Sequence, residues 1–240
     1  MSKRPTTLFV LTHPYLNTIS NAEVKAAIPS FLKDVHYEVL PVDINSGTLA
    51  KLNGVDFIDL RNRQTQFFRE RIKPRLEEEP NRHVLYVGKA PIPLAIHLGS
   101  LVESFEATDA AFQRHRTNEW YYDAQVDSAS EVVVAGPATG SRAVGDIVIK
   151  LSTTALIADY DVLSTVSNPL AIYSLQTDTL GGDVVNGPLA KRIVDELLRV
   201  LAQAHKDFPN KSATHLFFAG PMGLGFEIGA SLNPTIHFPF

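Results

Sequence analysis

The sequence contains no cysteine. This absence excludes a disulfide framework, a thiolate nucleophile and a zinc site built on cysteine ligands. A chain without cysteine suits a reducing compartment, so we expect a cytoplasmic location. Long hydrophobic runs are also missing, and the basic start MSKRPTTLFVL has no small-residue cleavage site after its apolar stretch. We therefore interpret the start as a first strand rather than a signal peptide, and we expect no membrane partner.

The sequence also has no excess of positive charge. It has 22 Lys and Arg residues against 26 Asp and Glu residues, which gives a formal net charge of −4. A protein that grips long nucleic acid must neutralise many phosphates, so we expect no such partner. This balance still leaves room for a local basic pocket that binds a small phosphate-bearing ligand.

Familiar catalytic motifs are absent as well. The sequence has no HExxH, GxSxG or Walker GxxxxGK[ST] motif, and no intact GxGxxG follows its first apolar run. Gly220, Gly223 and Gly225 do not have the spacing of the dinucleotide fingerprint. His83 and His215 each begin a predicted strand and are interpreted as structural. We therefore predict no catalytic residue, no cofactor and no metal.

Short apolar runs alternate with amphipathic stretches along the chain. This alternation is typical of βαβ units and predicts an α/β fold with mainly parallel sheets. Predicted strands cover residues 6–11, 36–44, 82–88, 147–152, 170–177, 214–220 and 235–240. Predicted helices cover residues 21–33, 63–79, 92–102, 155–166, 188–208 and 221–232. Asn21 is expected to cap the first of these helices and Pro29 to interrupt it.

One block of the first half recurs in the second half. HVLYVGKAPIPLAIHLG (His83–Gly99) aligns with HLFFAGPMGLGFEIG (His215–Gly229) after a two-residue gap, so that Pro91 aligns with Pro221. Both blocks contain a His, two apolar residues, an aromatic residue and a Gly, followed by a Pro-anchored helix start. Such a match at the same place in each half indicates an internal duplication.

The duplication predicts two fused Rossmann-like units, residues 1–125 and 126–240, related by a pseudo-two-fold. Gly and Ser accumulate between Trp120 and Asp146, and we expect the boundary there. The apolar run at residues 131–136 lies in this stretch and is interpreted as a strand that joins the two halves.

The ends of the predicted strands are the candidate ligand-binding edge. In open α/β sheets, ligands bind outside the carboxyl ends of the strands, where helix N-termini present free N–H groups. Gly88 and Gly220 lie at two of these ends, and Pro91 and Pro221 start the helices that follow. Two matched turns of this kind favour a binding cleft. The alternative is a tight strand–helix turn that packs well and binds nothing.

The first strand of each half ends in polar residues. These are Thr12-His13-Pro14-Tyr15 in the first half and Ser152-Thr153-Thr154 in the second. Hydroxyl groups and an imidazole at such a place can donate hydrogen bonds to phosphates or base edges. The alternative is that the Ser and Thr residues cap helices.

The segment FQRHRTNEWYYD concentrates basic and aromatic residues. It contains Arg114, His115, Arg116 and Trp120. A guanidinium group binds phosphate in a fork, and aromatic rings stack on bases, so this segment is a candidate for nucleotide recognition. The alternative is a strand whose charges face water while Trp120 lies in the core.

Together these features resemble those of SAVED domains. HLFFAGPMGLGFEIGASLN is similar to their C-terminal signature, and NRHVLYVGKAPIPLAIHLG with the FQRHRTNEWYYD region is similar to their first half. SAVED domains are fusions of two CARF-like Rossmann units that sense cyclic oligonucleotides in CBASS and type III CRISPR antiviral defence. The resemblance implies a ligand clasped between two CARF-like units. Carried over by position, the implied ligand contacts are His13, Tyr15, Gly88, Lys89, Arg114, Arg116, Trp120, Ser152, Thr153, Thr154, Gly220 and Pro221.

The implied function is to sense a cyclic di-, tri- or tetranucleotide and to relay binding to an effector, through changed self-association or domain geometry. SAVED domains usually follow an effector such as a nuclease, protease or TIR domain. This chain has no room for one, so we expect the effector to be a separate subunit or a domain outside this sequence. One alternative is a ring nuclease in which His13 or His115 acts as the base. Another is a nucleotide or sugar-phosphate enzyme on a doubly wound fold, and the residues leave all three open.

Overall fold

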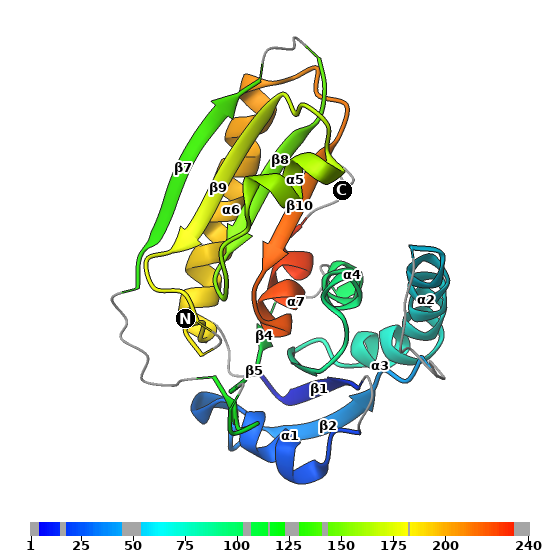
Figure 1. The fold of residues 1–240 in the computed structure, drawn as a ribbon. Helices are drawn as coiled ribbons and strands as arrows, with labels where there is room; N and C mark the ends of the chain where they lie inside the picture. Colours follow the sequence, from blue (N-terminus) through cyan, green and yellow to red (C-terminus); the bar gives the residue numbers. More distant parts are fainter. Residues whose placement is uncertain are drawn as a thin grey trace. The chain divides into compact units, whose positions relative to one another are not determined.

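The computed structural model describes residues 5–14, 18–44, 54–102, 107–114, 116–122, 130–140, 144–181 and 183–232. The chain divides into two compact units, whose elements are drawn in Figure 1. The first unit consists of Met1–Ala124 and Met222–Ser231, and the second consists of Gln125–Pro221 and Leu232–Phe240. The assignment of residues 1–125 and 126–240 to two CARF-like units stays a prediction.

The first unit contains a parallel sheet with the strand order β2-β1-β3-β4. Its strands are β1 (Thr7–His13), β2 (His36–Pro41), β3 (Arg82–Gly88) and β4 (Thr108–Ala110). Its helical segments are α1 (Asn21–Ala27), η1 (Ser30–Leu32), α2 (Gly54–Phe67), η2 (Phe68–Ile72), α3 (Lys73–Glu78) and α4 (Ile92–Val102). A short antiparallel pair, β5 (Phe112–Gln113) and β6 (Trp120–Tyr121), follows β4.

Both faces of this sheet are buried, which explains why β1 is apolar along most of its length. Phe9 and Leu11 pack in a cluster with residues of α3 and α4. Leu8 and Val10 pack in a second cluster with residues of α1 and η1. Because successive side chains of a strand point to opposite faces, one run of apolar residues serves both cores.

The second unit contains a mainly parallel sheet with the order β10-β8-β9-β7. Its strands are β7 (Val132–Thr139), β8 (Ile147–Ser152), β9 (Ala171–Thr177) and β10 (Thr214–Ala219), and its helices are α5 (Asp159–Thr165) and α6 (Gly187–Asp207). Strands β10, β8 and β9 are parallel, whereas β7 runs antiparallel to β9 at the edge. Val162 of α5 packs on Val148 of β8, and α6 runs along the opposite face in Figure 1. The predicted α/β fold with mainly parallel sheets is confirmed.

The start of α1 differs from the sequence-based expectation. Ser20, not Asn21, is the N-cap, so the prediction for Asn21 was wrong. The Ser20 hydroxyl accepts the Glu23 backbone N–H, and the Glu23 carboxylate accepts the Ser20 N–H. This capping box requires Glu three residues after Ser, a spacing that Ser20 has and Asn21 lacks. The predicted interruption at Pro29 is confirmed, because α1 ends at Ala27.

One further expectation is corrected by the structure, and another concerns residues that the structure does not describe. The helix predicted over 155–166 is shorter, since α5 starts only at Asp159. The Ser152 hydroxyl accepts the Ile157 N–H at 3.2 Å, and this turn occupies the residues before the helix. The predicted terminal strand at 235–240 lies outside the described residues.

Helix α7 (Met222–Ser231) follows β10 in the sequence but packs in the first unit, against α4. A Cβ atom at Gly99 would lie 2.2 Å from the Phe226 carbonyl oxygen, and one at Gly229 would lie 1.9 Å from the Ile96 carbonyl oxygen. Gly99 aligns with Gly229 in the internal repeat, and Ile96 aligns with Phe226. The contact is therefore reciprocal, and glycine permits the close backbone approach at both points.

Candidate functional site

The carboxyl ends of β1 and β3 form the candidate edge in the first unit. His13 ends β1 and pairs in register with Gly88, which ends β3. The Lys89 backbone N–H donates to the His13 carbonyl oxygen at 2.9 Å and extends this pairing by one residue. The structure thus brings three of the predicted site residues together at one sheet edge, directly before α4.

The His13 side chain lies in the interior, with none of its surface exposed. The Gln64 amide nitrogen lies 3.3 Å from Nε2 and donates to it, which leaves the ring proton on Nδ1, 3.4 Å from the Tyr86 hydroxyl. Burial and, to a smaller extent, the nearby His97 together lower the pKa of His13 to about 3. At neutral pH the ring is therefore uncharged, and its contacts hold the end of β1 in place.

Gly88 and Gly220 are each covered by an aromatic residue of their own strand. A Cβ atom at Gly88 would lie 1.9 Å from the Tyr86 hydroxyl oxygen. A Cβ atom at Gly220 would lie 2.5 Å from the Phe218 ring. In each repeat the aromatic residue two positions earlier covers its glycine, so the shared aromatic-x-Gly pattern is explained by packing within the repeat.

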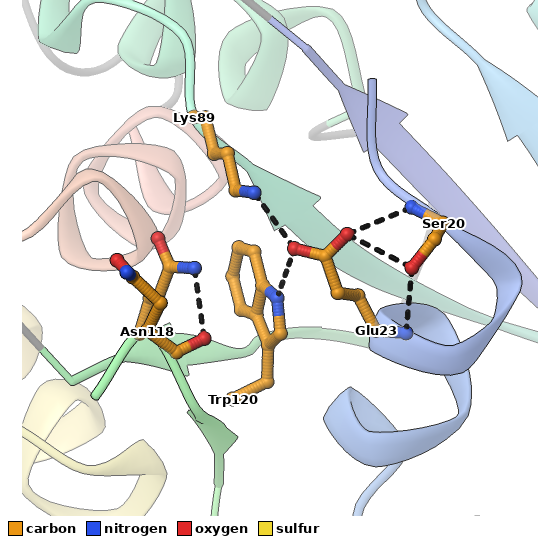
Figure 2. Close-up of polar contacts among 6 residues, drawn as sticks. Ser20, Glu23, Lys89, Asn118 and Trp120 are labelled. Carbon is orange, nitrogen blue, oxygen red and sulfur yellow. Dashed lines mark hydrogen bonds and ion pairs between the residues drawn. The ribbon is translucent and has the colours of Figure 1, made fainter. Parts of the chain in front are cut away.

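Lys89 forms a polar cluster with Glu23, Ser20 and Trp120, which Figure 2 shows. The Lys89 Nζ atom lies 2.7 Å from Glu23 Oε1, and Trp120 Nε1 donates to the same oxygen at 3.4 Å. The Ser20 N–H and hydroxyl donate to the other oxygen, Oε2, at 2.9 and 3.0 Å. The side chains of Lys89 and Glu23 are 24% and 28% exposed, so solvent reaches this pair.

The Glu23 carboxylate is ionised throughout the physiological pH range. Burial acts to raise the pKa of Glu23, but hydrogen bonds from Lys89, Ser20 and Trp120 outweigh it and lower the pKa to about 2. The sequence-based reasoning placed Lys89 at the site but missed Glu23. The Ser-x-x-Glu spacing reveals its role in the cap, whereas its pairing with a lysine 66 positions away leaves no local signal.

The basic–aromatic segment forms a hairpin beside this cluster. The Arg114 N–H donates to the Glu119 carbonyl oxygen at 2.8 Å, and the Arg114 guanidinium lies 5.3 Å from the centre of the Tyr121 ring. Arg116 is exposed at the turn. Trp120 is only 7% exposed and packs in the buried cluster of α1 and β3, with its indole N–H directed to Glu23. His115 and Tyr15 lie outside the described residues.

The second unit has its own strand-end edge. Ser152 and Thr153 are buried, and the Thr153 N–H donates to the Ala219 carbonyl oxygen at 2.8 Å. The Thr154 N–H donates to the same carbonyl at 3.0 Å. These contacts tie the end of β8 to the end of β10. Thr154 is half-buried, as are the two residues after β10, Gly220 and Pro221.

Two negative findings apply to the residues that the structure describes. Within this part of the chain, no group of three or more His, Asp or Glu residues is placed to hold a metal ion. Among the helices of the same residues, none is both long and apolar enough to cross a bilayer.

The fold is similar to that of solved receptors from Acinetobacter baumannii. The Cap4 SAVED/CARF-domain containing receptor solved with the cyclic trinucleotide 2′3′3′-cAAA matches with a TM-score of 0.59 and 14% identity, over 93% of this chain and 46% of that chain. The receptor with 3′3′3′-cAAA matches with a TM-score of 0.55 and 16% identity, over 86% of this chain and 45% of that one. This chain therefore spans less than half the length of the receptors that it matches.

No curated protein matches the chain. The model of the SAVED family, described as SMODS-associated and fused to various effectors sensor domain, matches residues 64–240. This match covers more than half of the chain and includes both repeated strand–turn–helix blocks. The chain therefore belongs to the SAVED family of sensor domains.

Proposed function

We propose that this protein binds a cyclic oligonucleotide second messenger and acts as a sensor in prokaryotic antiviral defence of the CBASS or CRISPR type. The observation that carries the proposal is the SAVED family match over residues 64–240. Receptors of similar fold were solved with cyclic trinucleotides, which makes a ring of three nucleotides the first ligand to test. Cyclic di- and tetranucleotides are the next candidates.

Positively charged side chains of the first unit would supply the phosphate contacts. Lys89 lies at the carboxyl end of β3 and at the start of α4, where a helix N-terminus favours negative charge. Arg114 and Arg116 lie in the neighbouring hairpin, and Arg116 is exposed. In the second unit, Thr154, Gly220 and Pro221 are the predicted contacts that reach the surface. We assign the buried His13 to positioning the end of β1. Because burial also lowers its pKa to about 3, His13 would be a poor base for a ring nuclease.

We further propose that binding is relayed to an effector in the cytoplasm through changed self-association. The family description, a sensor domain fused to various effectors, supports the link to an effector. The absence of cysteine supports a reducing compartment.

A cyclic trinucleotide is expected to stabilise the folded protein. At a ligand concentration about a hundredfold above the dissociation constant, binding adds roughly 2.7 kcal/mol to the free energy of unfolding. For a chain of this size this corresponds to a rise of roughly 5–10 °C in Tm. Thermal-shift assays with 2′3′3′-cAAA and 3′3′3′-cAAA, with linear ApApA and AMP as controls, measure the effect. A protein whose Tm is unmoved by cyclic di-, tri- and tetranucleotides would not be such a sensor, and unchanged sedimentation with saturating ring would contradict the relay.

Replacing Arg114 and Arg116 together by alanine is expected to weaken ring binding and leave the fold intact. A charge-assisted hydrogen bond to phosphate is worth roughly 1.5–3 kcal/mol, so affinity falls about tenfold or more. Titration calorimetry measures the affinity, and circular dichroism checks the fold. Arg199 on the exposed face of α6 provides the matched control, Arg199→Ala. Normal binding by the double variant would show that both arginines belong to a solvated hairpin.

A further inference from the structure

We propose that Glu23 is an internal anion that competes with the phosphate of the ligand for Lys89, and so sets the affinity of the site and its selectivity for phosphate-bearing ligands. This inference rests on the proposed function, because it concerns the same strand-end edge. It assigns to the ligand-free protein a carboxylate that an incoming phosphate replaces.

The groups around Glu23 form a set of donors that suits a phosphate oxygen. Its carboxylate accepts hydrogen bonds from an ammonium group, an indole N–H, a backbone N–H and a hydroxyl group. Proteins use the same kinds of donor to hold phosphate oxygens. Figure 2 shows Lys89 and Trp120 converging on one side of this carboxylate and Ser20 on the other.

The two carboxylate oxygens of Glu23 have separate partners. Oε2 accepts from Ser20 and completes the cap of α1. Oε1 accepts from Lys89 and Trp120. A phosphate can therefore take over Lys89 and the indole N–H while the capping contacts of Ser20 stay in place. Displacement of Glu23 from Lys89 does not require α1 to unfold.

Exposure and charge explain why Glu23 can be displaced, and by which ligands. Lys89 and Glu23 are both about a quarter exposed, and an ion pair that water reaches contributes little to stability. Glu23 remains ionised at neutral pH, since these hydrogen bonds lower its pKa to about 2. A neutral molecule cannot replace such a charge. A phosphodiester can, because it brings a permanent negative charge and acceptor oxygens of its own.

The substitution Glu23→Gln tests the competition directly. Glutamine at the third helical position preserves the capping box, so the variant removes the charge and keeps the fold. We expect Glu23→Gln to bind 3′3′3′-cAAA about fivefold more tightly, the scale of one partly exposed ion pair. Lys89→Gln is expected to weaken binding about tenfold. In the Lys89→Gln background, Glu23→Gln is expected to give no gain in affinity. Without the Lys89 ammonium group, Glu23 and the phosphate no longer compete for it, so the two substitutions are not additive.

A second probe makes the inference independent of the identity of the ring. Trp120 is the only tryptophan in the chain, so its fluorescence reports on this cluster alone. Inorganic pyrophosphate, titrated at constant ionic strength, is expected to change this fluorescence at lower concentration in Glu23→Gln than in the unsubstituted protein. The change should disappear in Lys89→Gln. Glu78→Gln removes the same charge from an exposed position that pairs with Arg75, and serves as the matched control.

The outcomes separate the two proposals. If the unsubstituted protein and Glu23→Gln respond equally to pyrophosphate, or if Glu23→Gln binds the ring more weakly, Glu23 orients Lys89 and the competition is overturned. If the pyrophosphate responses differ as expected but no variant binds any ring, the competition stands and the proposed function fails.

Discussion

Replacing Gly229 by alanine is expected to lower the free energy of unfolding by about 3 kcal/mol, the upper end of the usual cost of overpacking. The added Cβ atom would lie 1.9 Å from the Ile96 carbonyl oxygen, 2.8 Å from the carbonyl carbon and 3.0 Å from the Ser100 nitrogen. All three are backbone atoms of α4, so no side chain can rotate away. The helices must separate, and chemical denaturation followed by circular dichroism measures the loss.

The repeat supplies a partner variant and the fold supplies a control. Gly99→Ala is expected to destabilise by a comparable amount, because its Cβ atom would lie 2.2 Å from the Phe226 carbonyl oxygen. At Gly145 a Cβ atom would lie 3.9 Å from Leu170, an ordinary van der Waals contact, so Gly145→Ala should change stability by less than about 0.5 kcal/mol. If the Gly229→Ala variant is as stable as the Gly145→Ala variant, the contact between α4 and α7 is absent from the native fold.

Acidification from pH 6.5 towards pH 4 is expected to destabilise the protein, chiefly through His13. Burial lowers the pKa of His13 to about 3 in the folded state, whereas the unfolded chain titrates near 6.5. Between these two values the unfolded state binds more protons, so stability falls as the pH falls. One such histidine contributes a slope of up to about 1.4 kcal/mol per pH unit. His97 acts in the same direction, because burial also lowers its pKa, to about 4.

The variant His13→Gln isolates this contribution. Glutamine can keep polar contacts with Gln64 and Tyr86 but does not titrate, so its stability should depend less steeply on pH. Urea denaturation at pH 6.5, 5.5 and 4.5 compares the two proteins. Glu23 acts in a lower window, since its stabilisation is lost only as the pH falls from 4.5 towards 2. Equal slopes for both proteins between pH 6.5 and 4.5 would contradict a neutral, buried His13.

The sheets could be predicted from the sequence because their strands carry a strong local signal. Runs such as Leu8–Leu11 and Ile147–Ile149 are apolar on both faces, as buried parallel strands require. The position of α7 could not be predicted in this way. Its sequence indicates a helix after β10, but its packing on α4 depends on residues more than a hundred positions earlier. The aligned glycines at 99 and 229 were visible, and only the structure shows that each meets the opposite helix.

The predicted ligand contacts stay a prediction, but the structure shows where the described ones lie in the fold. The position of Lys89 directly after β3 could be predicted, because the order strand–Gly–Lys–Ala–Pro–helix fixes it. The burial of His13 could not be foreseen, since a polar residue after an apolar strand gives no sign of what covers it. The Ser-x-x-Glu spacing can reveal Glu23 as a capping residue, but nothing local in the sequence indicates its contact with Lys89. Its pairing with Lys89 arises because β1 and β3 are neighbours, so that the chain before α1 and the chain after β3 meet at one edge.

The most direct test of the proposed function is a calorimetric titration of the protein with 2′3′3′-cAAA and 3′3′3′-cAAA, followed by chromatography of the ligand. The expected result is saturable binding of one ring per chain, weakened by Lys89→Gln, with the ring recovered intact. No measurable binding of these rings, or of cyclic di- and tetranucleotides, would contradict the account. Binding followed by linear products would instead identify a ring nuclease.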